Sequence, residues 1–376
     1  MGNKMKDERA HLQLFDLIAR DWHLASPVQH ITFNADDSAV AFACADGSVH
    51  LAATADKASP NQRTRRAIDT GRLTIAPRDK PVLPMRQADF TAGRSSSVVA
   101  FGPTGFAFAK ADGRINSLTP GGIAVHIATR ANSAITSLAA TPDGKIVAFA
   151  AGDQLHISAA NSDSGRVFDL PAPVTVLAIS PDGGTLAAAF SGGLACWSLA
   201  NLDAAPSQIA LPGTALGLTW HPSGAWLSAA LGTDGFALIQ MADKQVQHRG
   251  NFPAPVLQTA FGASTDAVVA SGAFRLAAWS LQQGESLVTG KAGLVLIAAV
   301  AASPNRNLVA TGYANGLLSL AEIGRPTEML LREDTGAGVS ALSWSANGSY
   351  LAVAGSDGSA ALVEFPDSMF KPSSAS

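Results

Sequence analysis

The sequence predicts an all-β fold, a single β-propeller of four-stranded antiparallel blades, eight of them or alternatively seven. The chain of 376 residues repeats one pattern about every 40 residues, which is the period of four-stranded propeller blades. Within each repeat, apolar residues alternate with a period of two, which is typical of strands. Pairs such as Asp46-Gly47 and Asn315-Gly316 suit tight hairpin turns and separate the strands.

The composition argues against disordered, membrane-spanning and secreted disulfide-rich proteins. The chain is 47% hydrophobic and 15% charged, which argues against disorder, and no apolar run is long enough for a membrane helix. The first residues lack the apolar stretch of a secretory signal. The two cysteines, Cys44 and Cys196, cannot form a disulfide framework, so we expect a cytoplasmic protein. The alanine-rich composition is typical of a bacterial source.

The repeats follow one another in a regular order. We expect an N-terminal segment over residues 1–18, the propeller over 19–366 and a C-terminal tail over 367–376. Each repeat contains an apolar run, a turn rich in Pro, Asp, Gly or Asn, a second apolar run, a Gly-rich turn and a third run. The repeats begin near Val28, Ser96, Ile135, Val174, Leu216, Val256, Ile297 and Val339.

The first and last sheets of a propeller must protect their edges. The last repeat ends near Phe365, and only a short tail follows it. The stretch before the first repeat, up to Leu24, resembles the stretch from Val167 to Leu170 before the fourth repeat. We therefore predict that Arg20–Leu24 supplies the outer strand of the last blade, and that deleting residues 1–25 destabilises the whole ring.

Two of the repeats carry a recognisable family pattern. Ser180-Pro181-Asp182-Gly183 follows an apolar strand, and Cys196-Trp197-Ser198 comes one hairpin later. This pattern resembles the WD-repeat β-propeller family, and Ala278-Trp279-Ser280 is a second partial match. The resemblance covers roughly residues 22–366, although Ser follows Trp197 and Trp279 where the family has Asp, and no Gly-His pair opens a repeat. It implies a scaffold that holds partner proteins, with blades that depend on apolar packing more than on the family's hydrogen-bonded His, Asp, Ser/Thr and Trp.

Few titratable or metal-ligating side chains are predicted to line the central channel. The two rings of positions that we expect to line it contain no Asp or Glu, and His30 is the single titratable residue in them. Calcium binds several carboxylates and zinc binds three or four converging ligands, so we expect no metal, no cofactor and no enzyme activity. The rings are Thr32, Ala100, Ala139, Ala178, Thr219, Ala260, Ala301 and Ser343, and His30, Val98, Ser137, Val176, Gly217, Gln258, Ala299 and Ala341.

A basic insertion lies between the first and second repeats, over about residues 54–94. It contains nine basic and four acidic residues. We expect Ala67–Ile75 to form the outer strand of blade 1 and the rest to form a long loop. The loop is either a solvated spacer or a docking element, because Arg suits bidentate contacts with carboxylates or phosphates. The candidate partner-binding residues are Arg63, Arg65, Arg66, Arg72 and, from a hairpin of the sixth repeat, Arg275.

These observations favour a non-catalytic scaffold for protein–protein interaction, with one or more protein partners that present an acidic surface. Two alternatives stay open: a small-molecule or metal-binding propeller, with or without enzyme activity, and a nucleic-acid-associated protein that uses the basic insertion. Nucleic acid is less favoured because the insertion has one aromatic residue, Phe90, and the net charge of the chain is −3. The sequence does not predict an oligomeric state.

Overall fold

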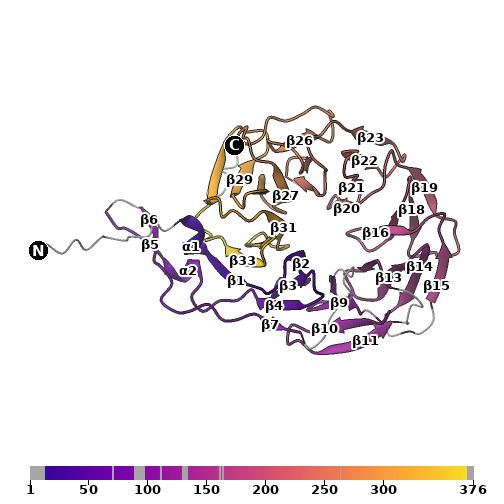
Figure 1. Ribbon diagram of the computed structural model, residues 1–376, viewed down its shortest axis with the longest axis horizontal. Coiled ribbons are helices and arrows are strands. Elements are labelled where there is room, and N and C mark those ends of the chain that lie inside the picture. Colours follow the sequence, from indigo (N-terminus) through magenta and orange to yellow (C-terminus); the bar gives the residue numbers. More distant parts are fainter. Residues whose placement is uncertain are drawn as a thin grey trace, which may run out of the picture.

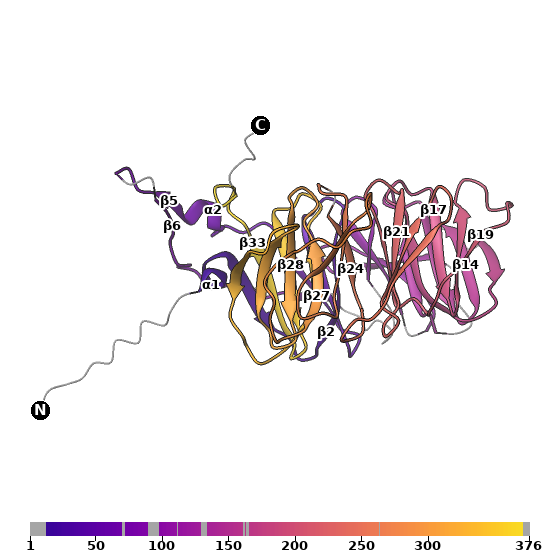
Figure 2. The same ribbon diagram turned by 90° about the horizontal axis from the view of Figure 1, so that it is seen from above.

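The computed structural model describes residues 13–69, 72–88, 98–110, 112–128, 134–160, 162, 165–262 and 264–370. Eight β-sheets surround a central axis, and each follows the previous one along the chain (Figure 1). Seen from above, the ring is a disc from whose edge one segment projects (Figure 2). The predicted all-β, eight-bladed propeller is confirmed, and helix is limited in the described residues to α1 (Leu14–Ile18) and α2 (Pro60–Arg63).

The strands of each blade run from the axis to the rim in chain order. Blade 1 contains β2 (Val28–Phe33), β3 (Ala39–Cys44), β4 (Val49–Ala53) and β7 (Arg86–Gln87), and blade 2 contains β8 (Val99–Phe101), β9 (Gly105–Ala109), β10 (Ile115–Leu118) and β11 (Ala124–Ala128). Blade 3 contains β12 (Ser137–Ala140), β13 (Ile146–Ala151), β14 (Gln154–Ala159) and β15 (Gly165–Asp169), and blade 4 contains β16 (Val174–Ile179), β17 (Thr185–Phe190), β18 (Gly193–Ser198) and β19 (Ser207–Ala210).

The second half of the ring repeats this arrangement, except that blade 6 has three strands and the outer strand of blade 8 is β1. Blade 5 contains β20 (Gly217–Trp220), β21 (Trp226–Ala230), β22 (Phe236–Gln240) and β23 (Val246–Arg249), and blade 6 contains β24 (Thr259–Gly262), β25 (Ala267–Ala270) and β26 (Ala277–Ser280). Blade 7 contains β27 (Ile297–Ala302), β28 (Leu308–Tyr313), β29 (Leu318–Glu322) and β30 (Glu328–Arg332), and blade 8 contains β31 (Val339–Trp344), β32 (Tyr350–Gly355), β33 (Ser359–Glu364) and β1 (Ala19–His23). In blade 6, one isolated bridge between Trp279 and Ser286 stands where a fourth strand pairs in the other blades.

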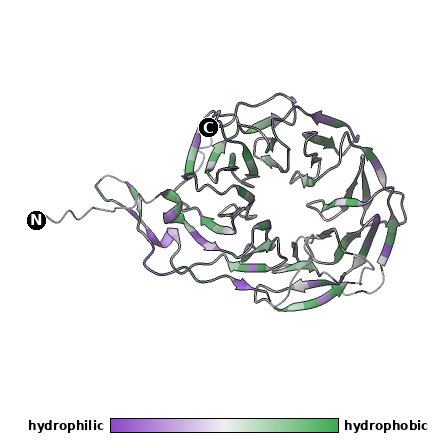
Figure 3. Ribbon diagram, viewed as in Figure 1, coloured by the Kyte–Doolittle hydropathy of each residue, from purple (hydrophilic) through white to green (hydrophobic). Residues whose placement is uncertain are grey.

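The hydrophobic core consists of the interfaces between neighbouring blades. Eight clusters of buried apolar side chains occur among the described residues, one for each pair of neighbouring blades. The second strands are the most deeply buried, and Ala187, Ala188 and Ala189 of β17 have no exposed surface. Apolar residues follow the inner strands, whereas polar residues gather on outer strands and on the projecting segment (Figure 3). Small residues in the second strands let neighbouring sheets approach closely.

Hydroxyl groups at one repeated position add hydrogen bonds across three of these interfaces. Thr136 Oγ1 donates to the Val174 carbonyl at 3.3 Å, and Thr175 Oγ1 donates to the Ala215 carbonyl at 2.6 Å. Ser340 Oγ donates to the carbonyl of Val28 at 2.9 Å, across the interface of blades 8 and 1. Each hydroxyl therefore links the start of one blade to the next around the channel.

The predicted N-terminal closure is confirmed. Strand β1 pairs antiparallel with β33, with Ala19 opposite Val363 and His23 opposite Ser359. The Leu24 amide continues the pairing by donating to the Gly358 carbonyl at 2.8 Å. Gly358 has a φ of +90°, and a Cβ there would lie 2.3 Å from the Leu24 carbonyl oxygen, so only glycine fits this turn.

The predicted outer strand of blade 1 is wrong. Its place is taken by β7, whereas the predicted range Ala67–Ile75 leaves the blade and includes β6 (Leu73–Ile75) of a separate hairpin. The reason is burial: Met85 and Ala88 flank β7 and pack into the clusters on either side of blade 1. Ile68, by contrast, is fully exposed. Residues 1–12, 70–71, 89–94 and 371–376 of the predicted segments lie outside the described residues.

Candidate functional site

The segment over residues 54–88, here called the insertion arm, leaves blade 1 after β4 and returns to it at β7. It contains α2 and a hairpin of β5 (Thr64–Arg66) and β6, in which Thr64 lies opposite Ile75 and Arg66 opposite Leu73. This hairpin extends outward from the rim of the ring, beside α1 (Figures 1 and 2). It is a two-stranded sheet of its own and pairs with none of the eight blades.

Local sequence explains the turn that starts the hairpin. Ser59 caps α2 by accepting a hydrogen bond from the Gln62 amide at 3.5 Å, and Pro60 occupies the first helical position, where its missing N–H is not needed. The Pro60 ring is buried, and its carbonyl accepts a hydrogen bond from Thr64 Oγ1 at 2.8 Å. This single helical turn directs the chain outward into β5.

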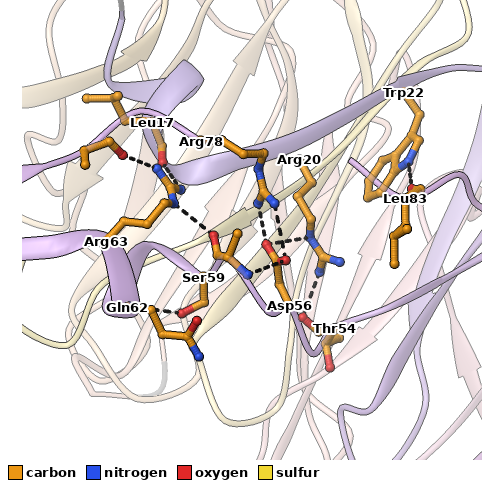
Figure 4. Close-up of polar contacts among 12 residues, drawn as sticks. Leu17, Arg20, Trp22, Thr54, Asp56, Ser59, Gln62, Arg63, Arg78 and Leu83 are labelled. Atoms are coloured by element: carbon orange, nitrogen blue, oxygen red, sulfur yellow. Dashed lines mark hydrogen bonds and ion pairs between the residues drawn. The ribbon is translucent and has the colours of Figure 1, made fainter. Parts of the chain in front are cut away.

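One guanidinium holds both ends of the hairpin. Arg63, directly before β5, donates to the Ala58 carbonyl at 2.9 Å and to the carbonyl of Ala76, which directly follows β6. It also donates to the Leu17 carbonyl in α1 at 2.6 Å (Figure 4). Burial lowers the pKa of Arg63, which nevertheless stays positively charged at neutral pH. The hairpin is therefore tied at its base to the N-terminal helix.

A second set of contacts surrounds Asp56. Its carboxylate accepts from both terminal nitrogens of Arg78 and lies 3.9 Å from Nε of Arg20, a residue of β1. Arg20 also donates to the Thr54 carbonyl at 2.7 Å (Figure 4). Burial alone would raise the pKa of Asp56, but the Arg78 hydrogen bonds, the Ala58 amide and the Arg20 charge outweigh it and lower that pKa. Burial lowers the pKa of Arg20.

The hairpin itself presents basic and apolar side chains to solvent. Arg65 and Arg66 of β5 are exposed, and Arg72 is exposed on the returning side. Ile68 and Leu73 are exposed as well, at 104% and 38% of the full value for the residue. The combination offers charge for an acidic surface and apolar area for contact on one projecting element.

The five candidate partner-binding arginines lie in three different environments. Arg65, Arg66 and Arg72 are together on the hairpin, and Arg63 is at its base with its donors directed to backbone carbonyls. Arg275 is in blade 6, half-buried, and its Nε donates to the Gly290 carbonyl at 3.0 Å. It therefore ties two loops of that blade together, away from the arm.

Sequence reasoning missed Arg20, Asp56 and Arg78 as a group. Arg20 is 9% exposed although it belongs to a strand. An arginine at an inward-facing position of a predicted strand needs a charged or carbonyl partner, and this was the available signal. The partner could not be identified from sequence, because Arg20 and Asp56 meet only after the ring has closed.

The central channel contains a cavity of about 460 Å³ lined by the first strands of the blades. The lining includes Thr219 of one predicted ring and Thr136, Thr175 and Thr259 from outside both rings. From the other predicted ring it includes His30, Ser137, Val176, Gly217, Gln258 and Ala341. Gln258 Oε1 accepts from the Val300 amide at 3.2 Å. In the described part of the chain, no three His, Cys, Asp or Glu residues lie close enough to hold a metal, and no helix is long and apolar enough to cross a membrane.

Comparison with known proteins supports the predicted resemblance. Residues 328–362 match the family model described as WD domain, G-beta repeat. The matched stretch begins with β30 of blade 7 and ends in β33 of blade 8, so the sequence repeat is offset from the blade by one strand. This offset is the reason that the last blade takes its outer strand from the N-terminus. No curated protein matches the chain.

Two solved structures show the same architecture. The computationally designed Ika8 protein is 19% identical with a TM-score of 0.64, and the match covers 94% of this chain and 99% of that one. The C-terminal WD40 domain of Sif2 is 15% identical with a TM-score of 0.65 over the same shares. At these identities the similarity concerns the fold alone, and the resemblance to WD-repeat β-propellers is confirmed.

Proposed function

We propose that this protein is a non-catalytic scaffold that binds other proteins, and that the hairpin of the insertion arm docks a partner with an acidic surface. WD-repeat propellers typically act as platforms for protein interaction. The observation that carries the proposal is the hairpin: Arg65, Arg66 and Ile68 are exposed on an element that projects from the ring and is anchored at its base.

The anchoring matters for the argument. Removing charged groups from water is costly, and the arm nevertheless holds Arg63, Arg78 and Asp56 in partly buried contacts at its base. A spacer loop does not need such contacts. A hairpin that is already ordered does not lose its conformational freedom on binding, so more of the contact energy is left for affinity. Arginine is also enriched at the energetic centres of protein interfaces.

The cellular setting is part of the proposal. Cys44 and Cys196 are free and buried, and burial raises the pKa of the Cys196 thiol to about 11. Such thiols are unreactive, and free thiols are typical of a reducing compartment. We therefore place the scaffold in the cytoplasm.

The test compares affinity capture from native lysate, read by mass spectrometry, for the wild type, R65E/R66E and a control K145E/R325E. The control makes the same change of charge at exposed positions on blades 3 and 7. We expect a stoichiometric partner that is lost with R65E/R66E, retained with the control and released by salt. A partner retained by both variants moves the docking site to the ring, and the absence of any partner overturns the scaffold proposal.

A further inference from the structure

We infer that the insertion arm is also a clasp on the closure of the ring, so that partner binding at the hairpin and the closed state of the ring stabilise each other. This inference rests on the proposed docking function of the hairpin. It adds that docking is coupled to the pairing of β1 with β33, the contact that closes the ring.

The arm holds the closing segment at three places. Arg63 donates to the Leu17 carbonyl, two residues before β1. Within β1, Arg20 donates to the Thr54 carbonyl at the start of the arm, and Trp22 Nε1 donates to the Leu83 carbonyl near its end at 2.8 Å. The contacts come from the start, the middle and the end of the arm, so the arm holds the closing segment along its length (Figure 4).

The arm also reaches the other side of the closure. Asn61 Oδ1 of α2 accepts from the amide of Asp367, just beyond β33, at 3.0 Å. At the start of the arm, Thr54 Oγ1 donates to the Asp37 carbonyl at 2.6 Å. The Asp37 carboxylate in turn accepts from the amides of Ala346 and Asn347 in blade 8, at 2.9 and 2.7 Å. The arm therefore links both strands of the closing pair, β1 and β33. It also links them to the turn of blade 1 that contains Asp37.

The hairpin is rigidly connected to these contacts. Its two strands enter and leave through Arg63 and Ala76, which are bonded to each other, and Arg63 is bonded to α1 at the same time. A change in the orientation of the hairpin must therefore disturb the contact with Leu17. Ile75 of β6 continues the connection, because it packs against the apolar cluster that contains Phe15, Ile18 and Val363.

The coupling follows from linkage. The clasp contacts exist only when β1 is paired, so the hairpin has its anchored geometry only in the closed ring. A partner that recognises this geometry binds the closed state better and stabilises it. By reciprocity, closure increases the affinity for the partner by the same factor.

The test measures amide hydrogen exchange in β1 and β33 of the full-length protein, with strand β17 of blade 4 as an internal reference for global stability. The probe is a short polyglutamate peptide, and its binding is followed separately by fluorescence anisotropy. We expect bound peptide to slow exchange in β1 by about five-fold or more, with β17 unchanged. R65E/R66E should abolish both binding and slowing, yet leave exchange in β1 without peptide as in the wild type.

A second variant tests the clasp without any partner. In R63K the charge stays, but the planar fork that reaches three carbonyls is lost, so exchange in β1 should accelerate by about five-fold or more while β17 keeps its rate. W22F loses the indole N–H bonded to Leu83 and part of the ring that packs against the cluster of blades 8 and 1. It should act in the same direction and serves where R63K does not fold.

The outcomes separate the two proposals. If the peptide binds the wild type without changing hydrogen exchange in β1, the proposed coupling is wrong but the docking proposal stands. Absence of peptide binding overturns docking, and the coupling with it. Unchanged exchange in β1 of R63K or W22F overturns the clasp whatever the peptide does.

Discussion

At the scale of single residues, Asp37 has an unusual combination of roles. Its φ is +57°, a left-handed conformation that Asp tolerates better than most residues, and its side chain accepts from two blade 8 amides while it is 6% exposed. One residue thus shapes the turn of blade 1 and links it to blade 8. The contact spans more than 300 positions of the chain, so no local pattern could predict it.

We expect D37A to lower the free energy of unfolding by about 2–4 kcal/mol, because two amides lose a charged acceptor and alanine disfavours the left-handed conformation. Urea unfolding followed by tryptophan fluorescence measures the change. D36A is the matched control, since Asp36 is exposed and accepts hydrogen bonds from Ser38 only. Equal unfolding midpoints for the two variants would show that the interblade contact contributes nothing.

Glu364 predicts a pH dependence of the clasp. This carboxyl ends β33 and is 8% exposed, and burial raises its pKa although Ser59, Arg20 and Arg63 oppose the shift. A carboxyl whose pKa is raised by folding contributes stability below its unfolded pKa, and this contribution is lost as the pH rises through the folded pKa. At pH 7 ionisation of Glu364 is therefore less favourable in the folded protein than in the unfolded chain.

We expect E364Q to raise the thermal midpoint at pH 7, because the amide removes the buried charge. The difference should shrink as the pH falls and close near about pH 4, where the carboxyl is protonated in both states. Asp56 acts in the opposite sense, since its lowered pKa makes its contribution disappear in acid. The two carboxylates repel each other, so E364Q also relieves Asp56 at pH 7 and adds to the expected difference. A midpoint difference that does not vary with pH would contradict this account.

The candidate site could be predicted in part at this scale. Clustered arginines in a compositional anomaly predicted exposed basic side chains, and Arg65, Arg66 and Arg72 are exposed. Arg63 and Arg275 have the same local signal, but their donors are directed to carbonyls that folding brings close, Leu17 and Gly290. A role for these two in partner binding stays a prediction, and the hairpin experiment above does not depend on it.

At the scale of elements, the closing strand tests how the ring is held. We expect deletion of residues 1–25 to lower the free energy of unfolding of the whole ring by at least about 3 kcal/mol, since β33 loses its outer partner and the buried Phe15 and Ile18 are removed. Thermal unfolding is the measurement. Deletion of residues 1–12 is the control, because it leaves α1 and β1 in place. A truncated protein that keeps its midpoint would rule out the N-terminal closure as a stabilising contact.

Inner and outer strands differ in how far the sequence predicts them. The first three strands of a repeat are recognised by apolar alternation and turn pairs. At least one face of each strand contacts a neighbouring blade, and the residues on that face are apolar. An outer strand has one pairing neighbour and a solvent-exposed rim, so its alternation is weak. Strand β7 has two residues, both exposed, and blade 6 has only a bridge at this position. The outer strand of blade 1 was therefore predicted at the wrong residues, and the predicted fourth strand of blade 6 is reduced to a single bridge.

At the scale of the whole molecule, the blade number could be predicted because repetition is global. A constant spacing of about 40 residues requires no knowledge of which side chains touch. The likeness of the stretch before the first repeat to the stretch before the fourth likewise predicted the closing strand. The position of the arm against that strand could not be predicted, since it depends on where two distant ends of the ring meet.

The ring should lose stability in independent steps when its interblade hydroxyl bonds are removed. We expect T136V, T175V and S340A each to cost about 1 kcal/mol, and the triple variant about 3 kcal/mol, because each bond belongs to a different interface. Urea unfolding of the three single variants and the triple variant tests this. A triple variant far less stable than the sum would show that strain spreads around the ring from one interface to another.

The pairing of Ala19 with Val363 has a consequence for how the protein is made. During synthesis, the segment with Phe15 and Ile18 leaves the ribosome before the blades and must wait, with its apolar side chains uncovered, until β33 follows them. Joining the two ends of so long a chain is entropically slow, so this pairing is expected to be the final and slowest folding step. A circular permutant that places residues 13–24 directly behind β33 converts this step into a local hairpin, and it should refold faster to the same ring.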